Sequence, residues 1–185
     1  VPLGPQPYFI VWEFYDDGLK LTYPAGGEGL VPGEVCRIHW DAFGNTDNFT
    51  LQYSPDNGAL WAQIGTATGE KRMFDWTVPN TVNGRIRVQV IRGSQSDTTD
   101  FPLTIAPVPD NLQVERVCLD SMTVSWSPVN DTLRYDVYLL GEKYMDIMGS
   151  TDTTTYTIPI QNPGGEQWFS VRATGAQELA GRRAV

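Results

Sequence analysis

The stretch that decides the fold is residues 122–139, MTVSWSPVNDTLRYDVYL, together with residues 169–173, FSVRA. Apolar residues stand two apart in three runs of this stretch: Met122-Val124-Trp126, Tyr135-Val137-Leu139 and Phe169-Val171-Ala173. Side chains of a β-strand alternate between its two faces, so each run predicts a strand with one buried face. Pro128 and Asn130 lie between the first two runs and favour a turn there.

The same spacing continues in both directions, and helical periodicity is almost absent. Short alternating runs recur about every ten residues between clusters of Gly, Pro, Asn and Asp. The further runs are Cys36-Ile38-Trp40, Phe49-Leu51-Tyr53, Phe74-Trp76-Val78, Ile86-Val88-Val90, Leu112-Val114 and Tyr156-Ile158-Ile160. This pattern predicts an all-β fold made of β-sandwiches.

Two prolines interrupt the pattern in residues 106–110, APVPD, and mark a stiff, extended linker. With 185 residues the chain has room for two small domains, which we place at 19–105 and 111–185. Residues 1–18 stand apart. Their apolar and aromatic run, Tyr8 to Tyr15, fits either a buried strand or the last strand of an upstream domain, and the sequence leaves both open.

Charge and hydropathy exclude two classes of partner. A net charge of -9 and a pI near 4.5 argue against a protein that binds the phosphate backbone of nucleic acid. No apolar run approaches the roughly 20 residues that span a bilayer, so no membrane span is expected in this segment. The chain opens at Val1 without Met or a leader, which is expected of a mature or excised piece.

The residues that could carry catalysis or bind a metal form no recognisable centre. His39 is the single histidine, and alternation predicts it on an exposed face, without a nucleophile or an orienting acid beside it. Cys36 and Cys118 have no CxxC or His spacing, and Cys36 shares the parity of a buried strand face. The acidic pairs Asp16-Asp17 and Asp97 to Asp100 lack the ligand spacing of a calcium loop. We therefore expect no catalytic, cofactor or metal site.

One motif matches the Asp-box of sialidase propellers: Ser54-x-Asp56-x-Gly58-x-x-Trp61. Propellers need several copies of this box at blade spacing, and the chain has one. The expected role is a structural hairpin turn. In it Asp56 accepts backbone N–H bonds, Gly58 takes a positive φ and Trp61 packs beneath.

The second half, 107–185, resembles fibronectin type III domains. The resemblance is carried by Pro109-Asp110-Asn111-Leu112, Thr123-Val124-Ser125-Trp126 with Pro128, Tyr135-Asp136-Val137-Tyr138 and Phe169-Ser170-Val171-Arg172-Ala173. Gln167 stands where that family usually has the tyrosine of its corner. The final strand, at 181–185, is short.

The first half, 19–105, looks like the immunoglobulin-like modules of secreted Bacteroidetes proteins, which are related to a yeast cell-wall synthesis family. The matching residues are 23–28, YPAGGE, Gly33-Glu34, Ile38-His39-Trp40, 53–58, YSPDNG, 75–79, DWTVP, and 85–88, RIRV. The pair resembles the region downstream of secreted subtilisin-like peptidases. The resemblance implies a secreted or cell-surface location and a non-catalytic role in spacing or docking a neighbouring domain. The alternatives are a substrate-binding accessory region of a protease or glycan-degrading enzyme, and an adhesin.

Alternation also predicts a candidate interaction surface. Burial of Val137, Phe169 and Val171 turns the intervening side chains outward. Exposed Trp, Tyr and Arg together are typical of contact hot spots and of platforms that stack on sugar rings. The predicted surface is Tyr138, Leu140, Tyr144, Trp168 and Arg172. Its expected partners are adjacent domains of the same chain, another protein or a polysaccharide, and simple exposure is the remaining alternative.

Overall fold

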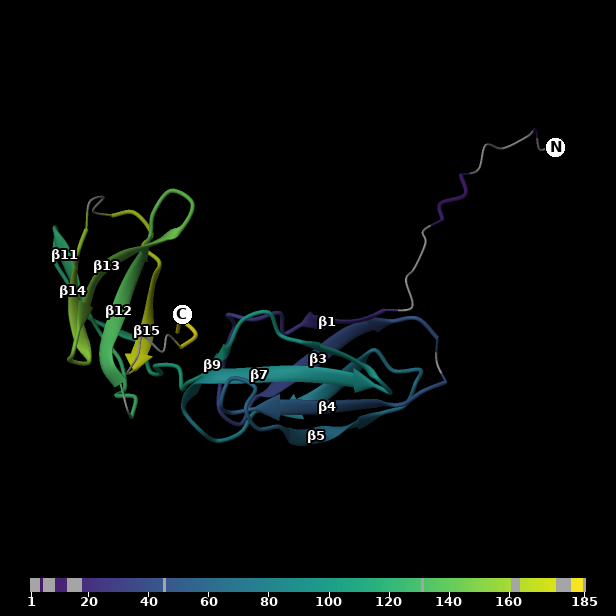
Figure 1. The fold of residues 1–185 in the computed structure, drawn as a ribbon. Helices are drawn as coiled ribbons and strands as arrows, with labels where there is room; N and C mark the ends of the chain where they lie inside the picture. Colours follow the sequence, from purple (N-terminus) through teal and green to yellow (C-terminus); the bar gives the residue numbers. More distant parts are fainter. Residues whose placement is uncertain are drawn as a thin grey trace.

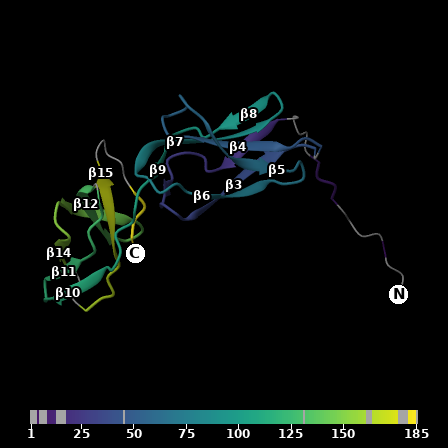
Figure 2. The same ribbon diagram turned by 90° about the horizontal axis from the view of Figure 1, so that it is seen from below.

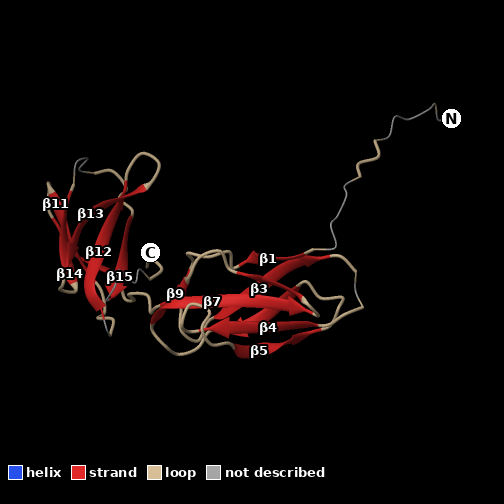
Figure 3. Cartoon of the chain, in the orientation of Figure 1, coloured by secondary structure: helices blue, strands red, loops and turns tan. Residues whose placement is uncertain are grey.

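The computed structural model describes residues 4, 9–12, 18–44, 46–130, 132–160, 164–175 and 181–184. These residues form fifteen strands and no helix, arranged as two β-sandwiches in tandem (Figures 1 and 3). The all-β prediction is confirmed. Of the apolar run Tyr8 to Tyr15, only residues 9–12 are described. Asp16, Asp17 and Val185 lie outside the described residues.

The first sandwich packs two sheets face to face. One sheet has the order β1-β3-β6 and the other β2-β9-β7-β4-β5, with β8 paired to β7. All pairs are antiparallel except β2 with β9, which is parallel. The bounds are β1 Leu19–Tyr23, β2 Gly29–Leu30, β3 Val35–Ala42, β4 Phe49–Ser54, β5 Ala62–Ala67, β6 Met73–Thr77, β7 Asn83–Arg92, β8 Gln95–Thr98 and β9 Leu103–Ile105.

Alternating side chains of β3, β4 and β7 fill the space between these sheets, as their spacing predicts. The Trp40 and Phe49 rings pack with centroids 5.1 Å apart at the centre of this core. The fully buried residues include Ile38, Leu51, Ile86, Val88, Val90, Leu103 and Ile105. Such a core buries enough apolar surface for the first sandwich to have its own hydrophobic stabilisation.

The second sandwich has two three-stranded antiparallel sheets, β10-β11-β14 and β13-β12-β15. Residues 181–184 run along the outer edge of β15, where Ala184 bridges Val171. The bounds are β10 Gln113–Val117, β11 Ser121–Ser125, β12 Thr132–Leu140, β13 Met145–Thr151, β14 Thr155–Pro159 and β15 Phe169–Gly175.

Trp126 anchors the second core, where its ring lies edge-on to Tyr135 at 5.3 Å. Tyr135 also serves a polar role, because its hydroxyl accepts a 2.8 Å bond from the Val129 amide. The fully buried residues around them are Val124, Val137, Ile158 and Val171. The predicted strand at Leu112–Val114 forms as β10, but all five residues of β10 are exposed. Leu112 lies just before β10 and packs, partly buried, against the second core, whereas Val114 is 48% exposed, so only part of the inward face expected there is covered.

The two sandwiches contact each other beside the linker (Figure 2). No strand forms in residues 106–112, and Ala106 is buried. The Arg182 guanidinium donates to both carboxylate oxygens of Glu34 in the first sandwich, at 2.7 and 3.0 Å. The Gly181 amide donates to the Ala173 carbonyl at 3.1 Å. Residues 181–182 therefore join β15 of the second sandwich to the first.

Candidate interaction surface

The outer face of the β13-β12-β15 sheet carries the predicted surface. Because Val137 and Val171 point into the core, the side chains between them point away from it. The register of β12 and β15 sets Asp136 opposite Arg172 and Tyr138 opposite Ser170. The face divides into a polar half around Asp136 and an apolar half around Trp168.

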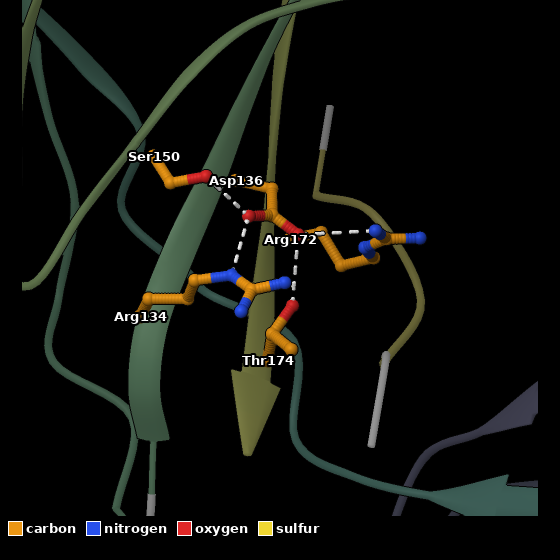
Figure 4. Close-up of polar contacts among 5 residues, drawn as sticks. All are labelled: Arg134, Asp136, Ser150, Arg172 and Thr174. Atoms are coloured by element: carbon orange, nitrogen blue, oxygen red, sulfur yellow. Dashed lines mark hydrogen bonds and ion pairs between the residues drawn. The ribbon is translucent and has the colours of Figure 1, made fainter. Parts of the chain in front are cut away.

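The polar half centres on the Asp136 carboxylate, which is only 1% exposed (Figure 4). Its Oδ1 accepts bonds from the Ser150 hydroxyl at 2.7 Å and from Arg134 Nε at 3.1 Å. Its Oδ2 accepts bonds from Arg172 at 3.0 Å and from the Thr174 hydroxyl at 2.9 Å. The partners come from β12, β13 and β15, so this one carboxylate ties all three strands together.

Burial and hydrogen bonding shift the pKa of Asp136 in opposite directions. Burial disfavours the charged form and raises the pKa of the carboxyl. Bonds from Ser150, Arg172, Arg134 and Thr174 favour the charged form and outweigh burial, so the pKa falls to about 2. Asp136 is therefore ionised at any ordinary pH. Since its acceptor positions are occupied, it is a structural anion and not a proton-transfer group.

Tyr138 lies at the middle of the face, and the expectation that it is exposed is wrong. Only 7% of Tyr138 is accessible. Two cations cover its ring: Arg172 at 5.4 Å and Arg183 at 4.5 Å from the ring centroid. Arg183 reaches this position because Ala184 pairs with Val171 beside it. Alternation predicted the side of the sheet correctly, but it could not predict a cover supplied by a distant segment.

The apolar half is open. Leu140, Tyr144 and Trp168 are exposed by 44, 77 and 60%. The Leu140 amide donates a 2.8 Å hydrogen bond to the Trp168 carbonyl, which holds these two residues side by side. The turn that carries Tyr144 is closed by a hydrogen bond from the Gly141 amide to the Tyr144 carbonyl. Ile147, 58% exposed and opposite Tyr138 in register, also belongs here. Ile147 stands two residues after Met145, and alternation puts both side chains on one face of a strand, so this spacing could have identified Ile147 from the sequence.

We call Leu140, Tyr144, Ile147 and Trp168 the apolar surface. The first sandwich does not cover it, since all four residues are exposed with both sandwiches present. Arg172, the fifth predicted residue, is engaged with Asp136 and Tyr138. Of the five predicted residues, Leu140, Tyr144 and Trp168 are thus exposed. Tyr138 is covered, and Arg172 is bound to Asp136 and lies over the Tyr138 ring.

The Asp-box-like segment is a hydrogen-bonded turn in the first sandwich. The Ser54 hydroxyl donates to Asp56 at 2.7 Å and accepts from the Gly58 amide at 2.7 Å. The Leu60 amide donates to Asp56 at 2.8 Å, and this bond is the main reason that the pKa of Asp56 is lowered. Gly58 has a φ of 99°, and a side chain at Gly58 would meet Trp61 at 3.8 Å. The Ser54 hydroxyl and the Asp56 carboxylate therefore both hold the turn together.

The remaining candidates for chemistry are dispersed. His39 lies between buried Ile38 and Trp40 on the opposite face of β3, as alternation predicts, but it is half-buried there, and its ring lies edge-on to Tyr23 at 6.5 Å. Cys36 is a buried free thiol whose pKa burial raises to about 11, and Cys118 is a half-exposed free thiol. Within the described ranges, no cluster of three or more His, Cys, Asp or Glu could hold a metal ion.

Two further comparisons concern membranes and relatives. The described part of the chain contains no helix with the length and apolar character to cross a bilayer. No protein-family model matches the sequence, and no curated protein matches it either.

Several solved structures resemble the fold at low sequence identity. A cytokine receptor complex is 14% identical with a TM-score of 0.49, covering 90% of this chain and 99% of that chain. A two-domain fibronectin type III segment of chicken tenascin is 13% identical with a TM-score of 0.45, covering 91 and 95%. The fibronectin(III)-like modules of Clostridium thermocellum CbhA are 15% identical with a TM-score of 0.38, covering 90% of each. At these values nothing about function follows from the likeness.

Proposed function

We propose that this chain is a pair of non-catalytic modules of a larger secreted or cell-surface protein, which spaces or docks a neighbouring domain. The two modules are residues 19–105 and 111–185, joined by residues 106–110. The observation that carries the proposal is the apolar surface, Leu140, Tyr144, Ile147 and Trp168, which is exposed on a sheet that the Asp136 network holds rigid. Exposed clusters of this kind are typical of interaction sites.

The first choice of partner is a protein surface. Leu140 and Ile147 are aliphatic and lie beside the aromatic residues, and aliphatic groups pack against protein but do not stack on sugar rings. A substrate-binding accessory region of a protease or an adhesin would use the same surface in the same way.

A polysaccharide is the second candidate. Trp168 and Tyr144 are the two largest exposed aromatic side chains of this face, and aromatic faces stack on sugar rings. An accessory role in a glycan-degrading enzyme would then follow.

Hydroxyl-radical footprinting tests the proposal. In the isolated chain, Trp168 and Tyr144 are expected to oxidise rapidly. In the longer secreted protein they are expected to be protected, whereas exposed Phe101 of the first sandwich serves as the matched control and stays reactive. If Trp168 and Tyr144 are protected only when a polysaccharide is added, the apolar surface binds sugar and not protein. Equal oxidation rates under all three conditions would refute an interaction role for this surface.

A further inference from the structure

The linker, residues 106–110, is held by hydrogen bonds at both of its ends. The Ala106 amide donates to the Leu30 carbonyl of β2 at 3.0 Å. The Ser127 amide of the second sandwich donates to the Asp110 carbonyl at 2.9 Å. The two prolines of the linker have fixed φ angles. The linker is therefore stiff, but a single connection of this kind still lets two bodies swivel about its ψ angles.

A second connection runs beside the linker, in residues 181–184. The Gly181 amide donates to the Ala173 carbonyl of β15 at 3.1 Å, and Ala184 exchanges both backbone bonds with Val171, at 2.8 and 3.2 Å. These bonds hold the segment to the second sandwich at both of its ends. Figures 1 and 2 both show the segment on the side of the second sandwich that faces the first.

The same segment lies with its backbone against the linker and the first sandwich. A Cβ atom at Gly181 would meet the Ala106 Cβ at 3.3 Å and the Pro107 carbonyl oxygen at 3.4 Å. A Cβ atom at Gly29 in β2 would meet the backbone nitrogen of Arg182 at 3.0 Å. Glycine, which has no Cβ, lets backbones approach this closely. The two glycines therefore make a tight joint between the segment and the first sandwich.

The Arg182 side chain adds a charged contact to this joint. Its guanidinium donates to both carboxylate oxygens of Glu34 in the first sandwich, at 2.7 and 3.0 Å. Both side chains are about half exposed, so water screens the ion pair and the pair by itself contributes little free energy. Its value is directional, because a guanidinium that makes two parallel bonds to one carboxylate has a defined orientation.

We infer that residues 181–184 are a clasp that fixes the angle between the two sandwiches. Tandem modules usually move relative to one another unless a large interface joins them. Here the linker and the clasp connect the same two bodies side by side, and two connections remove the swivelling that one allows. The pair is therefore a rigid bracket, which holds the apolar surface in one direction relative to the first sandwich.

Double electron–electron resonance on residues 1–185 tests the inference, because the distance between two nitroxide labels reports the spread of the angle. One label is attached to Cys118, a half-exposed free thiol of the second sandwich. The other is attached through Thr66→Cys, since Thr66 is exposed on β5 of the first sandwich. Cys36 is buried and is expected to stay unlabelled. A chain that carries only these labels is expected to give one narrow distance peak.

Two further substitutions loosen the clasp in different ways. Glu34→Arg places a second cation against Arg182 and is expected to broaden the peak. Gly29→Val leaves the charges unchanged, but its side chain needs space that the backbone of Arg182 occupies, so the peak is expected to shift or broaden. The matched control is Asp75→Arg, which makes the same reversal in the two-bond ion pair with Arg37. Because that ion pair lies within the first sandwich, the peak is expected to stay narrow.

Three results would overturn the inference: a broad distribution without Glu34→Arg or Gly29→Val, a peak that neither substitution changes, or equal broadening by Asp75→Arg. The first would mean that the sandwiches swivel in spite of the clasp, and the second that the clasp does not set the angle. The inference goes beyond the proposed function. A loose joint would leave the apolar surface exposed as before, so this experiment and the footprinting fail independently.

Discussion

Replacing Asp136 with Asn tests whether one buried anion holds the β13-β12-β15 sheet together. The substitution keeps the shape of the side chain, removes its charge and turns one acceptor into an NH₂ donor that faces the existing donors. A hydrogen bond to a charged group contributes about 1.5–3 kcal/mol. Arg134 and Arg172 remain 41 and 28% exposed and can turn toward water, so the four losses do not add. We expect the second sandwich to lose about 2–4 kcal/mol.

The pH dependence of this loss gives an independent check. The pKa of Asp136 is about 2 in the folded protein, and an unfolded aspartate has a pKa of about 3.9. The unfolded state therefore binds more protons in this range, and stability rises with pH. The contribution of Asp136 is fully present above about pH 4 and is lost as pH falls through about 2. Asp136→Asn lacks this titration, so the gap between the two proteins should narrow over that window.

Urea unfolding of the second sandwich, measured from neutral pH to acid, is the assay. The control is Asp75→Asn, which removes an exposed ion pair with Arg37 in the first sandwich and should leave unfolding unchanged. A loss below about 1 kcal/mol at neutral pH, or a loss that stays constant from neutral to acid pH, would refute the role of the buried charge.

Two further predictions concern the cores and turns. Trp126→Ala should cost the second sandwich about 3–5 kcal/mol through lost burial and a residual cavity, with the first sandwich's transition nearly unchanged; a change under about 1 kcal/mol in urea unfolding would contradict this. Ser54→Ala should cost the first sandwich about 1–3 kcal/mol, because the buried hydroxyl satisfies the Gly58 amide; unfolding indistinguishable from the parent chain would show that the turn does not need it.

Much of the fold was predictable because strand patterns are local. Two-residue spacing placed Ile38, Leu51, Val88, Val124 and Val137 in the cores, and all five are fully buried. Burial of one side chain of a strand dictates the orientation of its neighbours, so the side of the sheet on which Leu140 and Trp168 lie followed as well. The exposure of both residues was part of the same prediction.

The remaining features depend on segments that meet only in three dimensions. Asp136 was unremarkable in the sequence, and it became a buried anion because Ser150, Arg172 and Thr174 converge on it from two other strands. Tyr138 lost its exposure to Arg183, a residue 45 positions further along the chain. A period of two determines which way a side chain points. Whether water or another side chain covers it depends on long-range pairing, which local spacing does not encode.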